Sequence, residues 1–216
     1  MIKKINATLS EKLILIFLLA LAIFAFSFTV IIKNKCLFVK NFDPQKINFD
    51  KPKNIVVLNV ECGNVIIELY PELSPKAVDR FITLIKSNSY DDVAFHRVIK
   101  DKLIQAGDLE FGKKNKLNYG KIGTGKSGLG TISSEIDAEF DYKKGSVGLA
   151  RNLKYNTEDS QFFIILDDEP LFEGEYTPIG KVIYGIKILE KIKYSRRSEY
   201  VLRPDFINTI RMYRIN

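Results

Sequence analysis

The sequence predicts a mostly β domain, an antiparallel barrel or sandwich with helical caps, preceded by one apolar N-terminal helix. Three observations lead to this fold class. From residue 55 onward, short runs of β-branched and aromatic residues alternate with turn residues. Only two segments of that region have helical periodicity. Near the N-terminus, the twenty residues 13–32 include only two polar ones, Ser27 and Thr29.

The composition indicates an ordinary globular protein with one appendage. The 216 residues carry a formal net charge of +7 that is spread along the chain, and this length suits one domain plus an extra segment. No basic run with interleaved aromatic residues suggests nucleic-acid binding. The glycine-rich segment 123–127 lacks the spacing of a phosphate-binding loop, and no metal motif is present. We therefore expect no nucleic-acid partner, no metal and no cofactor.

We divide the chain into a short tail at 1–12, a transmembrane signal anchor at 13–32, a linker at 33–53 and a folded domain at 54–216. At about 1.5 Å per residue, the apolar run spans about 30 Å, which matches the hydrocarbon core of a bilayer. The alternative is a cleaved signal peptide, which has a shorter apolar region of about 7–15 residues and a cleavage site of small residues. The segment Ala25-Phe26-Ser27 conforms poorly to such a site, so an uncleaved anchor fits better.

The orientation of this anchor in the membrane is inferred from the residues that flank it. Lysines flank the apolar run on both sides, so the positive-inside rule does not choose a direction. Because short N-terminal tails usually stay in the cytoplasm, we expect a single-pass protein whose domain is extracytoplasmic, in a bacterium periplasmic. The two cysteines, Cys36 and Cys62, form no disulfide framework and do not identify the redox compartment.

The folded domain is expected to open with a hairpin. Strands at 55–60 and 65–70 flank a turn in which Gly63 or Asn64 can adopt a positive φ. A helix then begins at Ser74-Pro75, because serine can cap free N–H groups and proline suits the first helical position. The other predicted elements are a short helix at 186–192, a long surface loop at 110–134 and strands at 94–99, 146–150, 161–166, 179–183 and 206–213.

Six segments of the folded domain form a specific pattern in their order and spacing. They are Ser74-Pro75-Lys76-Ala77-Val78, Phe95-His96-Arg97-Val98-Ile99, Gln105-Ala106-Gly107-Asp108, Gly145-Ser146-Val147-Gly148-Leu149-Ala150-Arg151, Ser160-Gln161-Phe162-Phe163-Ile164 and Tyr176-Thr177-Pro178-Ile179-Gly180-Lys181-Val182. The pattern resembles the cyclophilins, the peptidyl-prolyl cis/trans isomerases, in a bacterial-like, membrane-anchored form, over roughly residues 54–214. This resemblance implies a closed eight-stranded antiparallel barrel capped by two α-helices.

Arg97 is the residue that the resemblance places in the catalytic role. A peptide bond resists rotation by about 18–20 kcal/mol because the nitrogen lone pair is delocalised. At a twist of about 90° that conjugation is lost, so a donor aimed at the proline nitrogen stabilises the twisted state more than the planar one. Arg97 offers a permanently charged guanidinium with several donors, and Gln105 would bind the substrate or orient Arg97. His96 points away from Arg97 on a strand, and the reaction moves no proton.

By position, the resemblance also assigns the substrate contacts. Apolar contact with the proline ring would come from Leu103, Phe163, Phe172 and Tyr176. Backbone groups of Ala150 and Arg151 would meet the peptide that flanks the proline, as a partial strand addition.

Two of the departures from the family pattern concern ligand binding. Lys102 stands where the family usually has a phenylalanine that lines the proline pocket, so a flat apolar wall is lost and a charge is added. Leu171 replaces a common tryptophan that the resemblance links to tight cyclosporin binding, so we expect weak cyclosporin binding.

The sequence supports two functions of different classes. The first is a membrane-anchored isomerase that acts on proline-containing segments of unfolded or newly translocated polypeptides, where uncatalysed X-Pro rotation takes about tens to hundreds of seconds. The alternative is a weakly active or inactive peptide-binding or chaperone module, which Lys102 and the long loop support. The presence of Arg97, Gln105 and Phe163 favours the enzyme, because pure binding needs no donor at the twisted nitrogen.

Overall fold

A computed structural model of the chain describes residues 8–214, so part of the expected N-terminal tail and the last two residues lie outside the described range. The chain divides into two compact units at residues 38 and 39. Within residues 8–214, the first unit contains one long helix, and the strands lie in the second.

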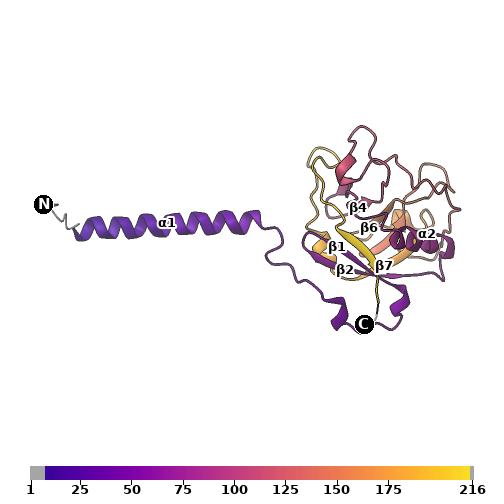
Figure 1. Ribbon diagram of the computed structural model, residues 1–216, viewed down its shortest axis with the longest axis horizontal. Helices are drawn as coiled ribbons and strands as arrows, with labels where there is room; N and C mark the ends of the chain where they lie inside the picture. Colours follow the sequence, from indigo (N-terminus) through magenta and orange to yellow (C-terminus); the bar gives the residue numbers. More distant parts are fainter. Residues whose placement is uncertain (1–7, 215–216) are drawn as a thin grey trace. The chain divides into compact units, whose positions relative to one another are not determined.

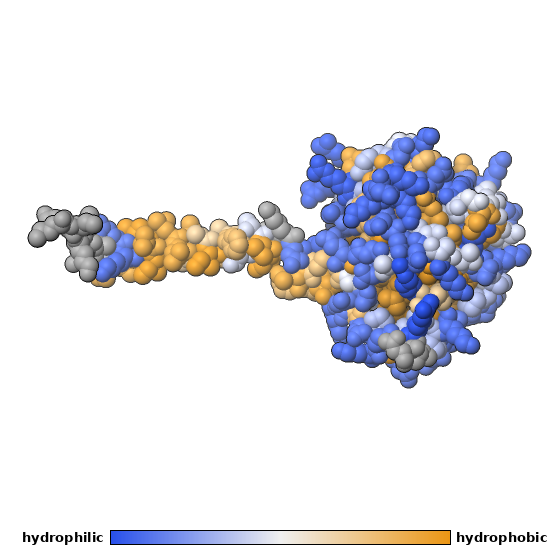
Figure 2. All heavy atoms as spheres, viewed as in Figure 1, coloured by the Kyte–Doolittle hydropathy of each residue, from blue (hydrophilic) through white to orange (hydrophobic). Residues whose placement is uncertain are grey.

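The long helix α1, Leu9–Lys33, begins with a reciprocal cap (Figure 1). The Thr8 side chain accepts the N–H of Glu11 at 3.3 Å, and the Glu11 carboxylate accepts the N–H of Thr8 at 2.7 Å. Figure 2 shows an apolar surface along the visible face of this helix. The stretch Leu9–Ile31 is long and apolar enough to cross a membrane, which is compatible with a membrane anchor or a signal sequence.

The second unit is built around one curled antiparallel sheet of eight strands in the order β3-β4-β6-β5-β7-β2-β1-β8 (Figure 1). Isolated bridges join Ala94 to Phe206 and Arg97 to Tyr200, next to the two edge strands, and thereby close the curl. The predicted eight-stranded antiparallel barrel is confirmed. The strands are β1 Ile55–Val60, β2 Gly63–Leu69, β3 Arg97–Ile99, β4 Leu103–Ala106, β5 Ser146–Leu149, β6 Phe162–Ile165, β7 Pro178–Tyr184 and β8 Thr209–Met212.

One strand, β4, has no counterpart among the runs predicted from residue type. It is only four residues long and is interrupted by the polar Gln105. It nevertheless pairs with β3 on one side and with β6 on the other. Its partner β6 lies far away in the sequence, so β4 forms because of long-range pairing and not because of local propensity.

Two α-helices accompany the sheet, α2 Pro75–Lys86 and α3 Ile186–Leu189. The apolar face predicted for α2 is buried in the main core, with Phe81 and Ile85 among its members. The predicted capping role of Ser74 is wrong, because its hydroxyl donates to the Pro178 carbonyl instead. The carboxylate of Glu135 accepts the first free N–H groups of α2, those of Lys76 at 3.2 Å and Ala77 at 2.9 Å.

Residues 39–54, here called the strap, pack against the outside of the barrel. Phe42 lies against Tyr184 with ring centroids 5.2 Å apart, and Phe49 meets Tyr213 edge-on at 4.9 Å. The strap contains the short 3-10 helices η1 Pro44–Lys46 and η2 Pro52–Asn54, and two more, η3 Lys114–Lys116 and η4 Pro170–Phe172, lie in later loops. The strap residues therefore belong to the folded unit.

The strap contacts predict a measurable contribution to stability. Phe42→Ala is expected to lower the free energy of unfolding by about 1–2 kcal/mol, because a half-buried aromatic pair is lost. Urea denaturation followed by circular dichroism measures this change. Phe38→Ala is the control, since Phe38 is 85% exposed. Equal midpoints for Phe42→Ala and the unmodified protein would contradict the packing role.

Candidate active site

The strand register brings the predicted catalytic and apolar residues into one row. Arg97 on β3 lies opposite Gln105 on β4, and Gln105 lies opposite Phe163 on β6. Phe163 in turn lies opposite Gly148 on β5. Directly paired residues of neighbouring strands project to the same face of a sheet. The pairing therefore gathers Arg97 and Gln105 with Phe163, which is distant from both in the sequence, on one face of the barrel.

Gly148 leaves the space that Phe163 fills. A Cβ atom at position 148 would lie 2.5 Å from the ring tip of Phe163 and 2.9 Å from the Tyr142 hydroxyl. Any larger residue would therefore displace the ring of Phe163 from the row.

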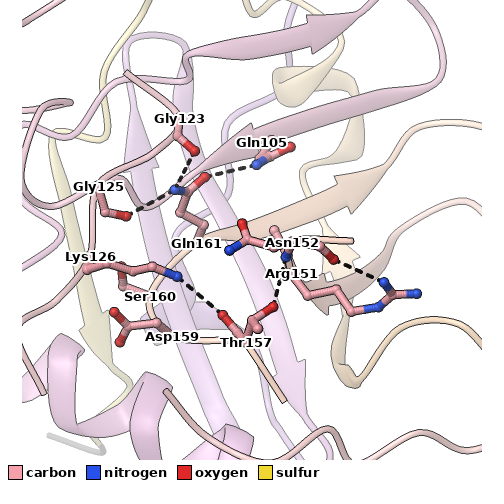
Figure 3. Close-up of a pocket in the computed structure, with 11 residues that line it drawn as sticks. Gln105, Gly123, Gly125, Lys126, Arg151, Asn152, Thr157, Asp159, Ser160 and Gln161 are labelled. Carbon is pink, nitrogen blue, oxygen red and sulfur yellow. Dashed lines mark hydrogen bonds between the residues drawn. The ribbon is translucent and has the colours of Figure 1, made fainter. Parts of the chain in front are cut away.

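A chain of hydrogen bonds runs through the polar end of the row. Arg97 Nη1 donates to the Gln105 side-chain oxygen at 3.2 Å, and the Gln105 amide donates to Gln161 at 3.0 Å. The Gln161 amide donates to the carbonyls of Gly123 and Gly125 at 3.0 and 3.1 Å (Figure 3). Gln161 was not among the predicted site residues, although it lies next to the conspicuous Phe162-Phe163 pair. Its role depends on the position of the loop and was not visible in the sequence.

On the other side of Phe163 lies an aromatic cluster. Phe163 is only 2% exposed and is covered by the half-buried Phe172 and Tyr176, whose ring centroids lie 5.3 and 5.2 Å away. Leu103 is buried in the same cluster. A ring that enters here meets Phe172 and Tyr176 first, with Phe163 beneath them. The structure thus brings all four predicted apolar contacts together.

Arg151 is fixed by its side chain at the border of this cluster. Its Nε donates to the Glu175 carbonyl at 3.0 Å, and Nη2 meets the Glu175 carboxylate at 2.8 Å. Its guanidinium carbon lies 4.3 Å from the Tyr155 ring centre and 4.9 Å from that of Tyr176. The N–H of the preceding Ala150 donates to the Gln161 carbonyl at 2.8 Å, so this donor is not available to a peptide.

Lys102 turns away from the apolar cluster that its neighbour Leu103 joins. Its side chain is 60% exposed, and its ammonium lies 3.6 Å from the Glu169 carboxylate. The ion pair holds the charge in a solvated position, where such pairs contribute little to stability. Lys102 therefore takes no part in the buried cluster.

A pocket of about 50 Å³ opens beside Gln105, between the loop 123–126 and the segments 150–152 and 157–161 (Figure 3). Arg151 and Ala150 belong to its lining, so it continues the predicted site. One wall of this pocket is formed by residues 123–126, which belong to the long loop predicted at 110–134.

Two buried carboxylates organise that loop. Asp108 accepts the N–H groups of Gly123 at 2.6 Å and Gly125 at 3.0 Å. Asp159 accepts the N–H of Ser127 at 2.7 Å and forms an ion pair with Arg80 at 2.7 Å. These backbone donors are therefore satisfied by the protein itself.

His96 lies on the buried side of the row, directly before Arg97. It is 1% exposed, and neither of its ring nitrogens forms a hydrogen bond within the described range. Burial lowers its pKa to about 4, although the nearby Asp108 carboxylate opposes this shift. His96 is therefore neutral at neutral pH and packs in the interior, 6.4 Å from the ring of Tyr200.

Comparisons with known proteins agree with this geometry. The model of the family "Cyclophilin type peptidyl-prolyl cis-trans isomerase/CLD" matches residues 55–214. A probable peptidyl-prolyl cis-trans isomerase of Brucella suis is 40% identical over 159 residues, which are 72% of this chain and 81% of the relative. The peptidyl-prolyl cis-trans isomerase ppi1 of Schizosaccharomyces pombe is 36% identical over 141 residues, 63% of this chain and 83% of its own length.

Solved structures show the same fold. A cyclophilin-type peptidyl-prolyl cis-trans isomerase of Cryptosporidium parvum, crystallised in the presence of the dipeptide Ala-Pro, is 29% identical with a TM-score of 0.64. The match covers 74% of this chain and 99% of that one. A cyclophilin of Hirschia baltica is 19% identical with a TM-score of 0.63, over 80% of this chain and 81% of its own, and supports the fold alone.

The buried His96 predicts a specific loss of stability in mild acid. Its pKa is about 4 in the folded protein and 6.5 in its ordinary state, so between these values only the unfolded chain takes up the proton. The free energy of unfolding should therefore fall as pH falls from 6.5 to 4, by up to about 3 kcal/mol from this group. Urea denaturation at several pH values measures this slope.

His96→Phe is the matched variant for that experiment, because it keeps an aromatic ring and cannot be protonated. Since His96 is the only histidine in the chain, the variant should lose most of the slope between pH 6.5 and 5. Identical slopes in the two proteins would show that His96 binds its proton equally well in both states.

Proposed function

Because this chain belongs to the cyclophilin-type peptidyl-prolyl cis-trans isomerase family, we propose that it accelerates rotation about X-Pro bonds through Arg97 and the row of residues that contains it. The observation that carries the proposal is the register that sets Arg97, Gln105 and Phe163 side by side. This row combines a charged donor with an apolar surface, and a twisted prolyl bond requires both.

The donor acts on the proline nitrogen. A guanidinium has five N–H groups. Within residues 8–214, the Nε–H of Arg97 donates to Glu199 and one Nη1–H donates to Gln105, while Nη2 forms an ion pair with Glu199. The remaining N–H groups of Nη1 and Nη2 are left for the substrate. A donor stabilises the twisted state selectively, because the nitrogen lone pair accepts a hydrogen bond only when conjugation with the carbonyl is broken. Gln105 holds the guanidinium from one side and is the second proposed catalytic residue.

The proline ring packs on the aromatic cluster. Phe172 and Tyr176 provide its exposed surface, and Leu103 and Phe163 provide the buried layer beneath. Ala150 and Arg151 border the peptide on the side of the pocket. Lys102 provides a 60% exposed side chain where the family usually has an apolar wall, so we expect weak substrate binding. Leu171, which is 82% exposed, offers cyclosporin a smaller surface than tryptophan would.

The location proposed for this activity is the outer side of a membrane. Helix α1 serves as a single-pass anchor, and the domain acts on unfolded or newly translocated polypeptides outside the cytoplasm. Support comes from the cysteines, which corrects the expectation that they carry no information on the redox compartment: Cys36 and Cys62 are both disulfide-bonded and neither is free. Disulfides persist in oxidising compartments and are rare in the cytosol.

The decisive test is the loss of activity in Arg97→Ala. The variant is expected to lower kcat/KM on the order of 100-fold, because the donor to the twisted nitrogen is removed. Exchange spectroscopy by NMR measures cis-to-trans interconversion in a peptide containing Ala-Pro-Phe. The control is Arg196→Ala, which removes an exposed arginine outside the site and should leave the rate unchanged.

The same experiment separates the enzyme from a peptide-binding module. Peptide binding without acceleration, in both the unmodified protein and Arg97→Ala, would refute the isomerase and favour the chaperone-like alternative. Lys102→Phe restores the usual apolar wall and is expected to lower KM a few-fold, since the proline ring gains contact area. It therefore tests whether Lys102 limits binding.

The proposed topology predicts a defined labelling pattern for the cysteines. In spheroplasts of an expressing bacterium, a membrane-impermeant maleimide should label the chain only after treatment with a membrane-impermeant reductant. A cytoplasmic domain would give the reverse pattern: no labelling in intact spheroplasts, and labelling after lysis without any reductant. Mass shifts on a gel distinguish these patterns, and Cys36→Ser/Cys62→Ser is the unlabelled control.

A further inference from the structure

A glutamate that the proposed mechanism does not use lies against Arg97. The segment before β8 runs along the edge of β3: the N–H of Val98 donates to the carbonyl of Glu199 at 2.7 Å, and Arg97 forms a bridge with Tyr200. These backbone contacts place the Glu199 side chain beside the guanidinium. The arrangement is built by the fold, since the two residues are far apart in the sequence.

The contact between Glu199 and Arg97 has a defined geometry. One carboxylate oxygen, Oε2, accepts the Nε–H of Arg97 at 2.8 Å and also forms an ion pair with Nη2 at 2.8 Å. Nη1, on the other side of the guanidinium, donates to Gln105 at 3.2 Å. Arg97 is therefore held by partners on two different elements. Because the guanidinium is planar and rigid, two such contacts fix the direction of its remaining N–H groups.

From this geometry we infer that Glu199 is a positioning residue for the reaction, which holds Arg97 in the orientation in which its remaining N–H groups meet the twisted proline nitrogen. The inference rests on the proposed role of Arg97. Without Glu199, the long arginine side chain would sample several rotamers, and the substrate would have to order it in each turnover.

Glu199 could also act in the opposite direction, because a carboxylate weakens the positive charge of its partner. Exposure decides between the two effects. The Glu199 side chain is 52% exposed and that of Arg97 is 31% exposed, so solvent screens the charge strongly. The hydrogen-bond geometry is not screened in this way. Orientation is therefore the larger effect, and removal of Glu199 should slow the reaction.

The single accepting oxygen provides a sharp experiment. In Glu199→Gln, the amide oxygen can accept the same Nε–H group without a charge. In Glu199→Ala, both the acceptor and the charge are lost. The matched control is Glu72→Ala, because Glu72 is 53% exposed and also pairs with a cation, Lys51 at 3.8 Å, but lies outside the site. All variants are compared with Arg97→Ala in the NMR exchange assay.

We expect Glu199→Ala to lower kcat/KM about ten-fold, mainly through kcat, and Glu199→Gln to stay within about two-fold of the unmodified protein. The Arg97 Nε–H resonance, assigned by its absence in Arg97→Lys, should be sharp and shifted in the unmodified protein and in Glu199→Gln. In Glu199→Ala it should return to the position of a solvated arginine. The melting temperatures of Glu199→Ala and Glu72→Ala should agree.

Three results would overturn the inference. Full activity in Glu199→Ala would show that Arg97 is oriented without the contact to Glu199. A rise of activity in both Glu199 variants would show that the carboxylate restrains Arg97, and an equal loss in both would show that charge matters and geometry does not. If Arg97→Ala itself retains full activity, the proposed function fails, so the two failures are distinguishable. If the melting temperature of Glu199→Ala is lowered, the activity of Glu199→Gln relative to the unmodified protein still tests the inference.

Discussion

The pairing of β4 between β3 and β6 is the constraint on which the active site depends. In an antiparallel ladder, directly opposed residues share a face and successive residues alternate between faces. With Arg97 opposite Gln105 and Gln105 opposite Phe163, all three project to the outer face, while His96 and Phe162 enter the interior. A shift of the register by one residue would exchange these sets and bury the charged donor.

The long loop beside the pocket depends on a second constraint, the need to satisfy buried backbone donors. Asp108 and Asp159 accept the N–H groups of Gly123, Gly125 and Ser127, and the Gln161 amide donates to carbonyls of the same loop. A loop without regular structure can be packed against the barrel only when such partners exist. The polar groups that shape the pocket are thus also those that hold its wall in place.

The site joins a rigid polar end to an aromatic end of limited exposure. Arg97 is held by Gln105 on one side and by Glu199 on the other, whereas the surface proposed for the proline ring consists of Phe172 and Tyr176 over a buried Phe163. Catalysis by differential binding requires the donor to be oriented before the bond twists. Binding strength is a separate property, and the effect proposed for the exposed Lys102 is on binding alone. The isomerase requires an oriented donor, whereas a peptide-binding module requires binding alone.

The sequence by itself determined much of the architecture and most of the site. The apolar helix, the first hairpin and helix α2 follow from local patterns, because periodicity and turn residues are local properties. The site roles of Arg97, Gln105 and Phe163 are implied by the resemblance of the ordered motifs to the cyclophilin family. It did not reveal β4, the role of Ser74, the two loop carboxylates or the contact between Glu199 and Arg97. Each of these depends on a partner brought close by the fold from a distant part of the chain. Only the tertiary structure decides such contacts, because residue type determines what a side chain can bind and the packing of the chain determines what it meets.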